Sequence, residues 1–158
     1  MIARSRKVMY METTSDEFAR MKGFTSMAIN KNPKEYTRQY VDEDFEVTDI
    51  TGISTSIDYA FDQIAEDAVH DKLIKIIDDE KIGDEAVVSM LSVDFTAAGT
   101  GLDSFVATKR DFAVIPGSEG DSLDAYTYGG TFRVKSERIV GEATSADDSK
   151  TATFALAE

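Results

Sequence analysis

The fold is decided by the closing stretch of the sequence, residues 125–158, which reads AYTYGGTFRVKSERIVGEATSADDSKTATFALAE. Within this stretch, residues 131–135 alternate polar and apolar side chains without a break. A period of two places Phe132 and Val134 on one face of a β-strand and the polar residues on the other. The pattern predicts strands at 126–135, 139–144 and 150–156, with a short turn at 145–149 closing the last two into a hairpin.

The same alternation recurs upstream. Further strands are predicted at 8–12, 24–30, 36–41, 53–61 and 108–115, together with a largely apolar strand at 87–95. The clearest of them places Ile53, Ile57 and Phe61 on one face. Residues 18–22 are expected to be a connection, and turns are expected at Pro33 and at Pro116, because proline fixes φ and lacks an N–H.

One segment changes period. Ala65, Val69, Leu73 and Ile77 recur every four residues, which predicts a helix over 63–79 with one apolar stripe. Asp62 is its expected N-cap, and Gly83 lies where a helix would stop. Many antiparallel strands with one helix predict a mainly β (α+β) fold. We expect two packed antiparallel sheets, as a sandwich or partly closed barrel, with the helix on the flank.

Length and composition limit the class of protein. At 158 residues with 42% apolar side chains, the chain fits one soluble domain. Its formal net charge of −13 argues against gripping duplex DNA, although it suits either simple solubility or a surface past which DNA moves. No apolar run approaches the roughly 20 residues of a membrane span, and no apolar segment follows the basic N-terminus as in a secretory signal. The absence of cysteine fits a reducing cytoplasm.

A search for reactive groups finds no consistent set. His70 is the single histidine, there is no cysteine, and no GxSxG elbow presents a serine. The glycines at 99–101 lack the following helix of a dinucleotide fingerprint. Carboxylates at 42–46 and 119–121 offer oxygen ligands, but neither run has the spacing of an EF-hand loop. We therefore expect no catalytic residue, cofactor or metal, and no enzymatic activity.

Two charged segments remain as candidate interfaces. One is an N-terminal arm at 1–7 carrying basic residues, and the other is a long loop at 42–50, in which residues 42–46 place one phenylalanine among four carboxylates. Each is compatible with an ordinary solvated segment or with docking onto a partner. The candidate interface residues are Arg4, Arg6, Lys7, Asp42, Glu43, Asp44, Phe45 and Glu46.

The order of elements resembles the tail tube proteins of long-tailed bacteriophages, which are similar to the tubes of contractile tails and injection systems. Two parts of the sequence carry the resemblance. The first is residues 57–62 (IDYAFD) leading into the helix with Val69, His70 and Leu73. The second runs from GGTFRV at 129–134 through GEAT at 141–144 to TATF at 151–154.

The resemblance implies a structural protein of one tube-like domain spanning 1–158. Six copies would form a ring, and rings would stack into a hollow tube through which DNA passes without specific binding. The loop at 42–50 would contact neighbouring copies, and the arms at 1–7 and 155–158 would touch adjacent rings. Tape measure and tube terminator proteins would be partners, with no membrane involved. The protein would be located in the virion tail, assembled in the bacterial host cytoplasm.

The segregation of charge leads to a related hypothesis, in which the three basic residues at 4–7 meet the acidic loop of the next ring. Replacing them with glutamate should then block stacking, whereas unchanged tube length and salt dependence would contradict it. Two alternatives remain open from the sequence. One is another virion component, such as a head-completion or decoration protein, and the other is a β-sandwich module that binds a small ligand or glycan.

Overall fold

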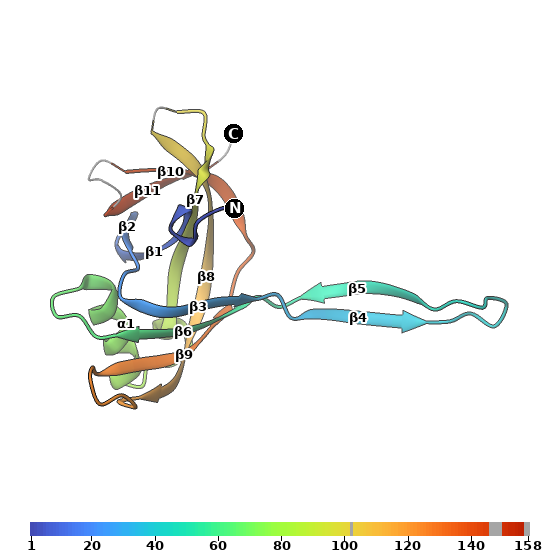
Figure 1. Ribbon diagram of the computed structural model, residues 1–158, viewed down its shortest axis with the longest axis horizontal. Coiled ribbons are helices and arrows are strands. Elements are labelled where there is room, and N and C mark those ends of the chain that lie inside the picture. The colour runs from blue at the N-terminus through green and yellow to red at the C-terminus, as the bar shows by residue number, and fades with distance from the viewer. Residues whose placement is uncertain (102, 146–149, 157–158) are drawn as a thin grey trace.

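The computed structural model describes residues 1–101, 103–145 and 150–156 (Figure 1). One helix, α1 (Ala68–Asp78), and two short 3-10 helices, η1 (Arg4–Arg6) and η2 (Gly83–Ala86), accompany the strands in these ranges. The strands are β1 (Lys7–Thr14), β2 (Glu17–Arg20), β3 (Phe24–Asn30), β4 (Pro33–Arg38), β5 (Val47–Ile53), β6 (Ser56–Asp62), β7 (Val87–Ala98), β8 (Ser104–Glu119), β9 (Thr127–Val134), β10 (Ile139–Thr144) and β11 (Thr151–Leu156).

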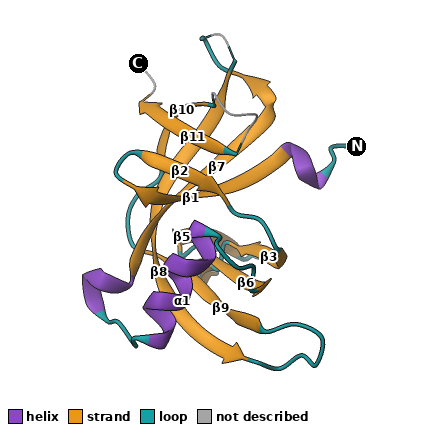
Figure 2. Ribbon diagram, turned by 90° about the vertical axis from the view of Figure 1, so that its left-hand side faces the viewer, coloured by secondary structure: helices purple, strands orange, loops and turns teal. Residues whose placement is uncertain are grey.

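Six of these strands close an antiparallel barrel. They follow the order β10-β11-β2-β1-β7-β8, and pairing of β10 with β8 joins the two ends. Closure removes the exposed edges that an open sheet would present. Figure 2 shows the barrel strands crossing above α1. The expected mainly β fold with one helix on its flank is confirmed.

The long strand β8 belongs to the barrel and to an extension of it. Its first half pairs with β10 at residues 104–109, and its second half pairs with β9 at residues 112–119. From β9 the sheet continues through β6 to β3. Pro116 therefore does not end the strand as expected from the sequence. It lies at a register shift between Pro116 and Glu119, where a residue without an N–H is tolerated.

Two apolar cores lie on opposite faces of the shared barrel wall. Inside the barrel, Tyr10 packs with Leu91 and Val93. On the outer face, Met11 and Met90 pack with Leu73 of α1 and with the side chains of β6 and β9. Because residues 8–11 of β1 are buried on both faces, they form a continuous apolar run rather than a strict alternation.

The helix α1 lies against β1, β2 and β8 (Figure 2). It is shorter than the expected 63–79 and its N-cap is Asp67, not Asp62. Asp67 Oδ1 accepts hydrogen bonds from the backbone N–H groups of Val69 (3.0 Å) and His70 (3.2 Å). Asp62 is unavailable because β6 continues to that residue, paired with Thr127.

A long hairpin, residues 33–53, projects from the extension as a separate two-stranded sheet (Figure 1). The strand expected at 53–61 is therefore two strands. β5 ends at Ile53, which is 58% exposed, and β6 begins at Ser56, so that Ile57 is buried and Ile53 is not. The change in direction at 54–55 separates residues that one continuous strand would place on the same face.

Other boundaries also differ from the expectations. Residues 17–20 form β2 rather than a connection, because Phe18 and Ala19 pair with both β1 and β11. The expected loop at 42–50 is shorter, since 47–50 belong to β5. The expected C-terminal arm at 155–158 begins within β11, and its residues 157–158 lie outside the described residues. The pairing of β10 with β11 confirms that hairpin, while 146–149 of its turn also lie outside them.

Candidate functional site

The single histidine is a packing residue. His70 is fully buried against the rings of Phe24 and Phe61. Its Nδ1 accepts a hydrogen bond from the backbone N–H of Ile64 (3.0 Å), which leaves Nε2 to donate to the carbonyl of Lys22 (2.6 Å). Both ring nitrogens are thereby used to connect the helix with two loops, and neither is presented to a substrate.

The buried hydroxyl of Tyr59 is equally unsuited to proton transfer. Burial raises its pKa to about 12, and the ring is stacked on Phe132 with the centroids 4.2 Å apart. Within the described part of the chain, its oxygen has no hydrogen-bond partner. A phenol held neutral in an apolar core does not exchange protons near neutral pH.

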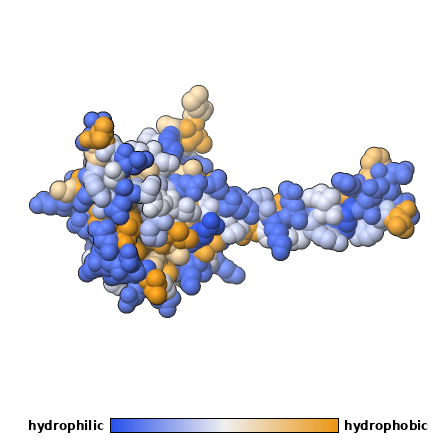
Figure 3. Space-filling view, turned by 90° about the horizontal axis from the view of Figure 1, so that it is seen from below, coloured by the Kyte–Doolittle hydropathy of each residue, from blue (hydrophilic) through white to orange (hydrophobic). Residues whose placement is uncertain are grey.

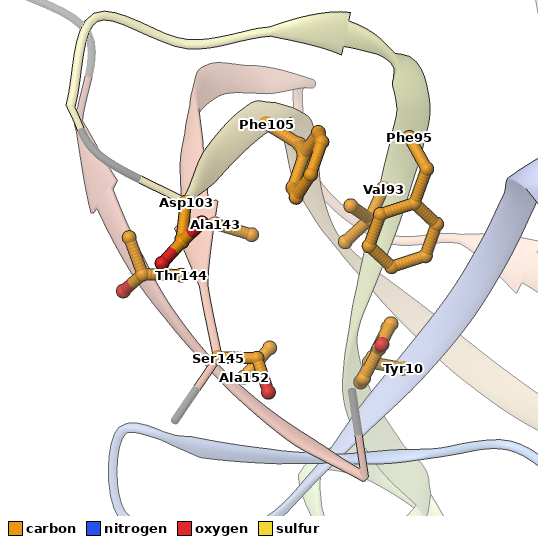
Figure 4. A pocket seen from close by; sticks show the side chains of 9 residues that line it. All are labelled: Tyr10, Val93, Phe95, Asp103, Phe105, Ala143, Thr144, Ser145 and Ala152. Atoms are coloured by element: carbon orange, nitrogen blue, oxygen red, sulfur yellow. The ribbon is translucent and has the colours of Figure 1, made fainter. Parts of the chain in front are cut away.

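A small pocket opens at one end of the barrel (Figure 4). Its volume is about 180 Å³, and its walls are largely apolar, with Tyr10, Val93, Phe95 and Phe105 on one side. Pockets that hold cofactors or drug-sized ligands usually measure about 300–1,000 Å³. This pocket is therefore too small for a ligand of that size.

In the described ranges, no group of three or more histidine, cysteine, aspartate or glutamate side chains is placed to hold a metal ion. None of the described helices has the length and apolar character needed to cross a membrane.

The basic residues at the N-terminus lie on the barrel wall. Arg6 Nη2 donates to the carbonyl of Phe95 (2.8 Å), and Lys7 Nζ lies 3.9 Å from the carboxylate of Asp94. A hydrogen bond from Arg4 to the carbonyl of Lys7 closes η1. The carboxylate of Asp94 also accepts from the hydroxyl and the N–H of Thr96, and these bonds together with Lys7 lower its pKa. The three basic residues are therefore ordered on the surface, with η1 at their start.

The acidic candidates gather at the hairpin tip, residues 39–46, between β4 and β5. The turn is held by two hydrogen bonds, from the N–H of Glu43 to the carbonyl of Tyr40 (3.0 Å) and from Gln39 Nε2 to the carbonyl of Glu43 (2.9 Å). Phe45 is 81% exposed, and Val41 is completely exposed. In Figure 3, apolar atoms are visible at this far end of an otherwise hydrophilic hairpin. The structure thus separates the two candidate groups, the acidic one at the tip and the basic one on the barrel.

Next to the tip, a cluster of side-chain contacts around Arg38 stiffens the hairpin. Arg38 pairs with Asp49 across the two strands (2.5 Å) and donates from Nε to the hydroxyl of Tyr40 (2.9 Å). Its guanidinium also lies over the rings of Tyr36 and Tyr40. Hydrogen bonding to Tyr40 and Asp49 raises the pKa of Arg38, so the cation persists at every practical pH. The tip is presented on a stiffened support.

The edge strand β3 is a surface that sequence reasoning missed. Among the described strands of the large sheet, β3 ends the order and pairs on one side with β6. Its side chains are mostly exposed, Ile29 by 50%. The hairpin was missed as well, because the apolar residues of 47–53 recur at every third position (Val47, Ile50 and Ile53) and give no strand alternation. The signal that could have identified it is an acidic turn between two segments that contain β-branched and aromatic residues.

Comparison with known proteins gives a structural match without a sequence match. No family model matches the chain, and no curated protein matches it. Among solved structures, a chain of the "Virion of native gene transfer agent (GTA) particle" superposes with a TM-score of 0.62 at 11% sequence identity. The superposition covers 87% of this chain and 97% of that chain. At this level of identity the likeness establishes a shared fold.

Proposed function

We propose that this chain is a structural protein of a phage-like virion, and that its copies form the rings of a tail tube. The observation that carries the proposal is the fold, because its superposition on a chain of a gene transfer agent virion covers 97% of that chain. The tail-tube resemblance in the sequence points to the same class of particle and implies six copies per ring with a lumen for DNA. Tape measure and tube terminator proteins are the other expected partners.

Two exposed features support self-assembly. The open edge of β3 offers unpaired backbone groups to a strand of another copy, and ring closure would pair every such edge. The long hairpin exposes apolar side chains that its own chain does not cover, among them Tyr36, Phe45 and Ile50. An isolated two-stranded hairpin is marginally stable in water, so these residues are best explained by burial against neighbours.

The described residues also favour a structural role over a catalytic one. The histidine is committed to packing, the buried tyrosine is held neutral, and the barrel pocket is small. A structural protein requires surfaces and strand edges that fit other copies, and it does not require a reactive centre.

Negative-stain electron microscopy of the purified chain at high concentration tests the proposal. We expect rings, or hollow tubes of uniform width. A strictly monomeric protein at every salt concentration tested would contradict it.

A matched variant isolates the role of the hairpin. The N–H of Ser54 donates to the carbonyl of Lys31 (3.1 Å), so the two ends of the hairpin are already adjacent. Residues 33–53 can therefore be replaced by a short glycine linker without distorting the barrel. We expect this variant to keep the circular dichroism spectrum of a folded β protein and to lose stacking. Stacking that persisted without the hairpin would show that other surfaces join the rings.

A further inference from the structure

A basic furrow runs between the edge strand β3 and the barrel wall. It consists of two hollows, of about 470 and 340 Å³, that share Met9 in their lining. Each hollow is within the size range of ligand pockets. Six cations line the furrow, namely Arg4, Lys7, Arg20, Lys31, Arg110 and Arg138.

The concentration of positive charge is unusual for this chain. The protein has 17 basic and 30 acidic residues, yet none of the carboxylates in the described ranges lines either hollow. Among the described residues, only one of the six cations has an ion pair, Lys7 with Asp94 at 3.9 Å. The guanidinium of Arg110 is held in place by bonds from Nε to the carbonyl of Ser136 (2.8 Å) and from Nη1 to the hydroxyl of Thr55 (3.3 Å). The furrow is therefore prepared for an anionic group.

The floor of the furrow is apolar. Met21, Phe24 and Met27 line the first hollow, and Ile57, Met90 and Phe112 line the second. Small inorganic anions gain nothing from such a floor, and neither does a nucleic acid backbone. The lining fits a ligand that combines large apolar side chains with carboxylates.

The hairpin tip has this composition. Residues 40–46 read YVDEDFE, which is three apolar or aromatic side chains with four carboxylates and no cation. Val41 and Phe45 are both more than four-fifths exposed. Among the described residues, none of the four tip carboxylates has an ion-pair partner in its own chain. Since local hydrogen bonds already order the turn, docking it costs little further conformational entropy.

A chain cannot place its own tip in its own furrow. Lys31 and Thr55, at the base of the hairpin, line the furrow. Six paired positions from Pro33 to Arg38 extend the hairpin by about 20 Å at roughly 3.3 Å per residue, so the tip lies at least that far from the base. Reaching back would require the hairpin pairing to be abandoned. The occupant is therefore another copy.

We propose that the hairpin tip of one copy docks into the basic furrow of the next, with Phe45 and Val41 on the apolar floor and the tip carboxylates against the furrow cations. The contact is head-to-tail, so every copy both donates a tip and receives one. The proposal rests on the self-assembly proposed above and specifies the surfaces that carry it. In this proposal the tip carboxylates bind Arg20, Lys31, Arg110 and Arg138 in addition to the N-terminal basic residues.

Cysteine cross-linking tests the contact directly, because the chain contains no cysteine of its own. A Phe45→Cys chain is mixed with an Ile29→Cys chain under mild oxidation, since Ile29 lines the furrow and is half exposed. We expect a disulfide-linked heterodimer. The matched control is Ile82→Cys, which is 83% exposed beyond α1 and outside the furrow. Equal cross-linking to Ile29→Cys and Ile82→Cys would overturn the proposal.

Charge reversal provides the second measurement. Lys31→Glu with Arg138→Glu should weaken association, measured by sedimentation, by at least about tenfold. Lys75→Glu with Lys150→Glu changes the net charge equally outside the furrow and should have a much smaller effect. Adding Asp42→Lys with Asp44→Lys to the furrow variant should restore association. Equal effects of both pairs, or the absence of restoration, would count against docking in the furrow.

The two proposals can fail separately. Rings or tubes that form without the selective cross-link, and that tolerate the furrow substitutions, would refute docking and leave the tube proposal standing. A selective cross-link in particles that never close into rings would support docking and refute the tube. A furrow that retained a DNA oligonucleotide while the selective cross-link was absent would also refute docking by the tip.

Discussion

The barrel and the long hairpin are both made of antiparallel strands, yet they use their apolar residues in opposite ways. In the barrel and its extension, Phe132 and Leu91 are fully buried. In the hairpin, Ile50 and Ile53 are more than half exposed. Strands of one kind thus build a core in one region and a surface in the other. The difference teaches that alternation reports the conformation of a segment, whereas burial depends on what lies opposite each face.

The largest expected contrast is the removal of one apolar side chain from each region. Phe132→Ala should lower the free energy of unfolding by about 3–5 kcal/mol, because it leaves a cavity beside Tyr59 in the core under α1. Ile50→Ala in the hairpin should change it by less than about 0.5 kcal/mol. Urea denaturation of the two variants measures both values. Similar losses would mean that the hairpin is packed in the isolated chain.

Glycine substitutions sharpen the comparison at the backbone. A Cβ at Gly130 would lie 2.3 Å from the carbonyl oxygen of Ile115 and 2.9 Å from the backbone nitrogen of Gly117, and neither can move alone. Gly130→Ala should therefore cost about 1–3 kcal/mol. In the hairpin, a Cβ at Gly52 meets only Lys34 at 3.9 Å, so Gly52→Ala should be neutral or slightly stabilising. Thermal denaturation measures both effects. A larger loss of stability for Gly52→Ala than for Gly130→Ala would mean that the hairpin is crowded at Gly52.

Removing one carboxylate from each region should give a smaller difference in stability. Asp67 is 6% exposed and caps α1 through two backbone N–H groups, so Asp67→Ala should cost about 1 kcal/mol. Asp49 in the hairpin is paired with Arg38 in solvent, and Asp49→Ala should produce a smaller loss. Both can be read from urea midpoints at one pH. An equal loss at Asp49 would show that the hairpin pair contributes as much as a helix cap.

The smallest expected effect depends on pH. The N–H (2.6 Å) and the hydroxyl (3.2 Å) of Thr100 donate to Glu142 and lower its pKa. A lowered folded-state pKa adds stability above the unfolded-state value, and this stability is lost as the pH falls through the folded-state pKa. Glu142→Gln should therefore reduce the melting temperature slightly at about pH 7, and this deficit should shrink as the pH is lowered through the folded-state pKa. A deficit of the Glu142 variant that stayed constant with pH would contradict this assignment.

Much of the fold could be predicted from the sequence. The alternation at 131–135 lies in β9, the period of 3.6 around Leu73 lies in α1, and the closing hairpin was correctly placed. Errors occurred where a tertiary contact decided the outcome. β2 was missed because its four residues are too short for a pattern, and Phe18 is buried by pairing on both sides. Ile53 was assigned to the core because no local signal marks the change in direction after it.

For the candidate site, the sequence identified the charged residues but not their arrangement. The acidic group at 42–46 and the basic group at 4–7 are visible as runs, because their members are neighbours in the chain. The furrow is not visible in this way, because its cations Lys31, Arg110 and Arg138 are spread over more than a hundred residues of the chain. Whether these residues join the N-terminal ones in one binding surface stays a prediction until it is tested.

By itself, the sequence determined the strand and helix periods and the acidic character. Those properties depend on local spacing or on composition. Only the tertiary structure decided that six strands close into a barrel, that β8 is shared with an extension, and that residues 33–53 extend into solvent. The physical reason is that strand pairing is non-local. A strand has the same period of two whether its neighbour is a barrel wall, a hairpin partner or another copy of the chain.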